Sequence, residues 1–85
     1  MPSGSEPLPG AFSRAVTAEL RAVMGRHGIS AREVAAAAGR SPGYVTKRLR
    51  DEASFTTNDL ADICAGINLD LLSLLVAAVR SYRGR

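Results

Sequence analysis

The residues from Glu33 to Arg48, EVAAAAGRSPGYVTKR, contain the pattern from which the fold can be predicted. The run of alanines leaves room for another helix to approach the backbone closely, and Gly39 permits the left-handed turn that ends a helix. Ser41 is a favoured N-cap, and Pro42 stands at the first helical position, where its missing N–H costs nothing. The stretch therefore predicts two short helices joined by a tight turn.

Upstream of this turn, the sequence predicts two helix boundaries and one long helix. Apolar residues at i, i+4, i+8 and i+11 give Phe12–His27 one buried face. Gly28 ends this helix, and Ser30 with Glu33 can form a capping box ahead of a short helix over Ala31–Ala38. The side of the long helix opposite its buried face carries Arg14, Thr17 and Arg21.

Downstream, apolar residues at i, i+3, i+4 and i+7 predict a fourth helix from about Thr57 to Ile67, with Cys64 in the core. Asn68 can adopt a left-handed cap, and Asp70 can cap a fifth helix that reaches about Ser81. The apolar arc of this fifth helix spans more than half its circumference. One small domain rarely buries so wide an arc, which indicates a partner surface.

Composition excludes several classes of protein. The chain has 85 residues and a single cysteine, so it has no internal disulfide, and its apolar runs are far shorter than the ~18 residues of a membrane span. We expect no secretion signal, because the first ten residues, MPSGSEPLPG, lack a charged start followed by an apolar stretch and are typical of a flexible tail. No nucleophile, general base or phosphate loop is assembled, so we expect neither an enzyme nor a bound cofactor or metal. The expected location is the cytoplasm.

Positive charge is concentrated around the third helix. The net charge is +3, yet between Val34 and Arg50 there are four cations and no acid. Placing Val45 and Leu49 inward fixes the rotation of this helix, since they lie about 40° apart. The outward positions are then Gly43, Lys47 and Arg50, flanked by Tyr44 and Thr46.

Residues Gly28 to Leu75 resemble the lambda-repressor and Cro-like helix-turn-helix family, also called XRE-like. The matching residues are GIS at 28–30, EVAAAAG at 33–39, Ser41, Val45 and INLDLLSLL at 67–75. The resemblance implies an all-α, compact five-helix domain over residues 11–82, between a tail at 1–10 and a basic tail at 83–85. It also implies a sequence-specific regulator whose third helix lies in the major groove of double-stranded DNA.

The chain departs from the family pattern at several positions. Ala31 stands where relatives often have glutamine, and Pro42 and Gly43 replace amide side chains that read adenine, which shifts the expected base reading to the residues that follow. An Arg–Glu bridge of the family is replaced by Met24 and Leu49, an apolar pair. Arg40 and Arg48 occupy usually apolar positions, and we expect them to enlarge the basic surface.

The resemblance and the charge pattern together define two candidate surfaces. The expected DNA-contact residues are Arg32, Arg40, Ser41, Gly43, Tyr44, Thr46, Lys47, Arg48 and Arg50. A second apolar stripe on the fifth helix, formed by Leu72, Val76 and Val79, predicts a homodimer, unless the N-terminal tail or a longer first helix covers it.

The expected function is that of a phage or prophage-type repressor, or a Cro-like protein, which binds a pseudopalindromic operator as a homodimer at the bacterial nucleoid. No membrane contact and no small-molecule ligand are expected. The alternative is a protein-interaction module on the same scaffold, such as an antitoxin or an antirepressor-like chain. The replacement of the reading amides at Pro42 and Gly43 favours this alternative slightly.

Overall fold

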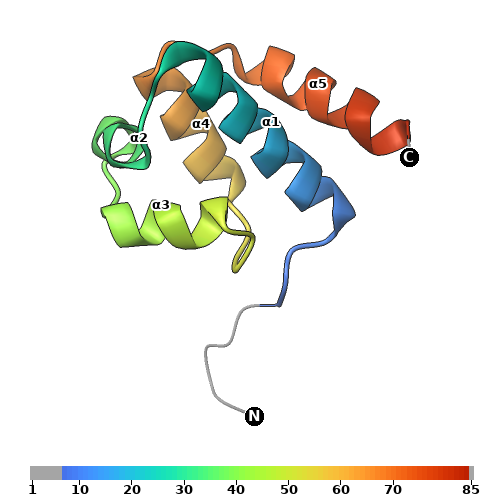
Figure 1. Ribbon diagram of the computed structural model, residues 1–85, viewed down its shortest axis with the longest axis horizontal. Helices are drawn as coiled ribbons and strands as arrows, with labels where there is room; N and C mark the ends of the chain where they lie inside the picture. Colours follow the sequence, from blue (N-terminus) through green and yellow to red (C-terminus); the bar gives the residue numbers. More distant parts are fainter. Residues whose placement is uncertain (1–6, 85) are drawn as a thin grey trace.

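The computed structural model describes residues 7–84, and these fold into five helices without strands, as predicted. The first six residues of the expected tail, and Arg85 of the expected basic tail, lie outside the described residues. The helices are α1 (Ala11–His27), α2 (Ala31–Ala38), α3 (Pro42–Leu49), α4 (Thr57–Gly66) and α5 (Leu71–Arg83). In Figure 1, α5 runs alongside α1, while α2 packs on both α3 and α4.

The helix ends follow from the capping residues. Gly28 and Gly39 adopt the left-handed conformation, with φ of 66° and 68°, and Asn68 does so at 58°. Ser30 and Glu33 form the expected capping box. Asp70 caps α5, which continues two residues beyond its expected end, so Arg83 is helical.

Each of the five helices contributes to one core. Leu20, Val34, Val45 and Ile63, one from each of the first four helices, are fully buried, and Leu74 and Ala78 of α5 join them. Cys64 is also buried there. Burial, aided by the negative charge of Asp70, raises the pKa of its thiol and so favours the protonated form. Cys64 is therefore a packing residue, as predicted.

The helix pair α2 and α4 packs closely at Gly66, the last residue of α4. A Cβ added to Gly66 would lie 2.6 Å from Cβ of Ala37 and 2.7 Å from its carbonyl oxygen. Ala35 and Ala38 on the same short helix are buried. Small side chains on α2 and a glycine on α4 are what this close approach requires.

Two expectations about α1 were wrong. Thr17, expected on the outer side, is 1% exposed, because α1 is covered by α5 on one side and by the segment before α4 on another. Phe12, expected to be buried, is 39% exposed. It lies in the first turn of α1, where its ring contacts Tyr82 edge-on, with centroids 5.5 Å apart.

Candidate nucleic-acid interface

The start of α3 is fixed by its own first residues. The Ser41 hydroxyl accepts a hydrogen bond from the backbone N–H of Tyr44 at 3.2 Å, and Pro42 occupies the first turn. Val45 is fully buried, which sets the rotation of the helix. α3 forms one edge of the molecule in Figure 1. Gly43 and Lys47, on the side of the helix opposite Val45, are exposed.

Most of the expected DNA-contact residues lie at the surface. The exposed ones are Arg32, Ser41, Gly43, Lys47 and Arg50, and Thr46 is half-buried. Among the described residues, no atom outside the helix lies within 4 Å of a Cβ added at Gly43. The outer side of α3 is therefore small at its start and basic towards its end.

Three of the expected DNA-contact residues instead contact α4: these are Arg40, Tyr44 and Arg48. Their common partner is Asp59, which is 2% exposed. Asp59 accepts hydrogen bonds from Arg40 Nε at 3.0 Å and from the Tyr44 hydroxyl at 2.8 Å, and its carboxylate lies 3.9 Å from Arg48 Nε. We call these four residues the Asp59 cluster.

Within the Asp59 cluster, the guanidinium of Arg48 lies over the ring of Tyr44, 3.5 Å from its centroid, and the Arg48 side chain is 8% exposed. Arg40 also bridges to Asp62 at 2.9 Å. Two cations of the expected basic surface are therefore paired with two acids of α4. Contrary to our expectation, Arg48 does not enlarge the exposed basic surface.

Hydrogen bonding stabilises the charged form of Asp59. Burial alone would raise the pKa of its carboxyl, but hydrogen bonds from the backbone of Thr56 and from the side chains of Tyr44 and Arg40 outweigh burial, and the pKa lies below its ordinary value. The same contact raises the pKa of the Tyr44 hydroxyl, because the hydroxyl donates to the carboxylate. Near neutral pH the cluster therefore holds a charged carboxylate and a protonated phenol.

Sequence reasoning missed a link between α1 and the end of α3. Arg21 Nη1 donates to the carbonyl oxygen of Leu49 at 2.5 Å and lies 3.7 Å from the Asp51 carboxylate. Met24 is buried and Leu49 packs against the core, in keeping with their apolar character. The two helices are thus also joined by a contact to a backbone carbonyl, which residue types alone do not reveal.

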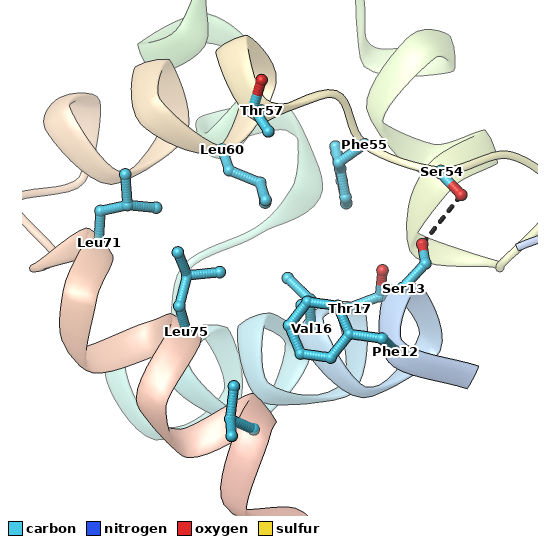
Figure 2. Close-up of a pocket in the computed structure, with 11 residues that line it drawn as sticks. Phe12, Ser13, Val16, Thr17, Ser54, Phe55, Thr57, Leu60, Leu71 and Leu75 are labelled. Carbon is cyan, nitrogen blue, oxygen red and sulfur yellow. Dashed lines mark hydrogen bonds between the residues drawn. The ribbon is translucent and has the colours of Figure 1, made fainter. Parts of the chain in front are cut away.

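The second candidate surface surrounds an apolar pocket of about 500 Å³. Figure 2 shows Phe12, Phe55, Leu60, Leu71 and Leu75 around this space, with a hydrogen bond of 2.9 Å between the Ser13 and Ser54 hydroxyls at one side. Of the expected dimer residues, Val79 lines the pocket, while Leu72 is 68% exposed and Val76 37% exposed. The apolar stripe on α5 is therefore real, but one of its members faces the pocket.

Within residues 7–84, no three His, Cys, Asp or Glu side chains come together as metal ligands would. None of the helices described is long and apolar enough to cross a membrane.

The five helices, with short α2 and α3 joined by a left-handed glycine, define an all-α helix-turn-helix domain of the kind found in transcriptional regulators. Two crystal structures of the clp gene regulator ClgR from Corynebacterium glutamicum are similar to it. One is 29% identical, with a TM-score of 0.74 over 86% of this chain and 94% of that chain. The other is 28% identical, with a TM-score of 0.75 over 91% and 81%. No protein-family model and no curated protein matches the chain.

Proposed function

We propose that the chain is a DNA-binding transcription regulator that inserts α3 into the major groove. The observation that carries this proposal is the exposed side of α3, where Lys47 and Arg50 point outward. Of the acids of α4, Asp59 pairs with Arg40 and Arg48, and Asp62 pairs with Arg40. The likeness to a clp gene regulator supports a regulatory role.

Each exposed residue has a role that its chemistry suits. Lys47 and Arg50 donate to guanine or to phosphate, and the Thr46 methyl group contacts thymine. Ser41 and Gly43 lie at the N-terminal end of α3, where the absence of a side chain at Gly43 allows close approach to a phosphate or base edge. Arg32, at the start of α2, contacts the DNA backbone.

The members of the Asp59 cluster contribute less to the proposed contact with DNA. Arg40 and Tyr44 are partly exposed and can reach phosphate only at the edge of the interface. Arg48 is buried and acts through the placement of Tyr44. We therefore assign direct reading of bases to Thr46, Lys47 and Arg50.

We further propose a homodimer formed through α5. Three of the five exposed large apolar residues among those described, Leu72, Val76 and Tyr82, lie on this helix, other residues of which line the apolar pocket. Association of two copies would remove this surface from water, and a twofold axis would place two α3 helices about 34 Å apart, one turn of DNA. A pseudopalindromic operator follows.

Replacing Leu72 by glutamate is expected to dissociate the dimer. The substitution places a charge on the most exposed apolar side chain of α5, where burial against a second copy would leave that charge unpaired. Ser81→Glu is the matched control, because Ser81 is exposed on the same helix but lies about half a turn around it. Sedimentation equilibrium should give a monomer for the first variant and a dimer for the control. A dimeric L72E protein would place the interface elsewhere.

Selection from a random duplex pool tests the function directly. We expect a pseudopalindromic sequence, bound ~10³-fold or more tightly than scrambled DNA at the same salt concentration. Its affinity should also fall steeply as salt is raised, since each phosphate contact releases counterions. If no sequence is enriched and binding does not depend on salt, the chain is not an operator-binding protein.

That negative outcome would favour the second candidate function, a protein-interaction module of the antitoxin or antirepressor kind. The apolar pocket beside the exposed stripe of α5 is the observation that favours this candidate. The phage-type or Cro-like repressor is the narrower form of the first proposal. The likeness to a bacterial gene regulator supports the broader form, a bacterial transcription regulator.

A further inference from the structure

We propose that Asp59 is a positioning residue for DNA recognition, which holds α3 in the orientation that presents Lys47 and Arg50 to the groove. The inference rests on the proposed function and extends it to a buried residue of another helix. Asp59 is 2% exposed and therefore cannot contact DNA itself.

The packing of α3 shows why such a residue is needed. The apolar side of the helix is anchored by Val45, which is fully buried, and by Leu49 at its end. Both anchors pack in the core, and the helices against which α3 packs are α1 and α2. The backbones of α3 and α4 do not pack on one another, and the two helices are joined by the side chains of the Asp59 cluster. Without these side chains, α3 could turn about its apolar anchors.

The contacts of Asp59 extend along the whole of α3. Tyr44, in the first turn, donates its hydroxyl to the carboxylate, and Arg48, in the last turn, lies over the Tyr44 ring. Arg48 Nη1 also donates to the Tyr44 carbonyl oxygen at 3.2 Å. Arg48 follows Lys47 directly in the chain, so a shift of the Tyr44–Arg48 pair displaces the residues that we expect to read bases.

The same carboxylate also fixes the turn before α3. Arg40 Nε donates to Asp59, and its Nη1 donates to the carbonyl oxygen of Ala38 at 2.6 Å, at the end of α2. Asp59 is itself held by its own capping box, in which its backbone N–H donates to the Thr56 hydroxyl at 3.0 Å. Asp59, at the start of α4, therefore contacts both the turn before α3 and the side chains of α3 itself.

The test is Asp59→Asn, measured beside Asp62→Asn. Both substitutions remove one negative charge, and both acids pair with Arg40, but Asp62 is exposed, whereas Asp59 is buried against Tyr44 and Arg48. Three quantities are measured for each folded variant: affinity for the selected duplex, affinity for scrambled DNA, and hydrogen exchange of the backbone amides.

We expect Asp59→Asn to weaken binding of the selected duplex about tenfold or more, the scale of one lost base contact. Affinity for scrambled DNA should be unchanged or higher, because it depends on charge and not on the orientation of α3. Amides of α3 should exchange faster, while those of α1 and α5 should not. Asp62→Asn should resemble the wild type in all three measurements.

Two outcomes would overturn the proposal. One is a folded D59N protein with wild-type affinity and wild-type protection of α3. The other is a uniform loss of protection in every helix with unchanged affinity of the folded fraction, which would give Asp59 a purely structural role. If D59N does not fold, Arg48→Lys decides, because it keeps the charge but removes the planar stack on Tyr44. It should then show the same loss of specific affinity.

Failure of the proposed function gives a different result from failure of this inference. If the wild-type protein selects no duplex, the regulator proposal fails. The positioning role is then judged by hydrogen exchange alone. Loss of protection confined to α3 in the D59N or R48K variant would support it, and the absence of such a loss would contradict it.

Discussion

Replacing Lys47 and Arg50 together by alanine is expected to lower affinity for the selected duplex by about a hundredfold or more. Each well-formed contact of a basic side chain with guanine contributes about 1–3 kcal/mol. Both residues are exposed, and Arg40 and Arg48, the other cations of this stretch, are held against α4. The remaining side chains of α3 therefore cannot replace the two that are lost.

The control for this double variant is Arg80→Ala with Arg83→Ala, which removes the same charge from the last turn of α5. In Figure 1 the end of α5 lies on the opposite side of the molecule from α3. Affinities at several salt concentrations separate the two effects, because each lost phosphate contact reduces the salt slope by about 1. Equal losses in both variants would mean that only net charge matters and that α3 does not read bases.

The fold could be predicted from local chemistry because its helix ends are determined locally. Gly28, Gly39 and Asn68 adopt the left-handed conformation that their residue types permit, and Ser30 and Asp70 cap the helices that they precede. Burial was predicted less well. Periodicity describes a helix that is covered on one side, and α1 is covered on two, which is why Thr17 is buried.

The DNA-contact residues were predicted in part, and the errors in this prediction share one cause. Val34 to Arg50 does contain four cations and no acid, but this count leaves out Asp59 and Asp62, which come later in the sequence. In the fold, Asp59 pairs with Arg40 and Arg48, and Asp62 pairs with Arg40. A usually apolar position that carries arginine can signal a buried ion pair as well as a larger basic surface. The exposure of Lys47 and Arg50 follows from placing Val45 and Leu49 inward and needed no tertiary information.

The apolar surface of α5 was also predicted only in part from the sequence. Its width predicted more apolar area than one small domain covers, and Leu72 and Val76 are exposed. The sequence could not show that Val79 would instead face a pocket, because the pocket depends on where α1, the segment around Phe55 and α5 meet.

Gly66→Ala is expected to destabilise the domain by about 2 kcal/mol. The added Cβ would lie 2.6 Å from Cβ of Ala37 and 2.9 Å from its carbonyl carbon, and a backbone atom cannot rotate away as a flexible side chain can. α4 must then move away from α2, which loosens the packing of Val34 and Ile63. Alanine ordinarily favours helix by up to about 1 kcal/mol over glycine, but Gly66 is the last residue of α4, where this gain is reduced.

Gly25→Ala is the matched control and should change stability in the opposite direction. Gly25 lies inside α1, and among the described residues no atom outside that helix is within 4 Å of its added Cβ, so alanine should stabilise by about 0.5–1 kcal/mol. Thermal unfolding measures both, since 1 kcal/mol shifts Tm by about 4–8 °C in a domain of this size. A G66A protein as stable as G25A would show that α2 and α4 are not in tight contact at Ala37. The turn into α3 begins at the end of α2, so a shift of α2 in the G66A protein could also move α3. If the G66A protein is destabilised but still binds the selected duplex when folded, the orientation of α3 does not depend on the α2–α4 contact. This result would favour the Asp59 cluster as the group of residues that holds α3 in place.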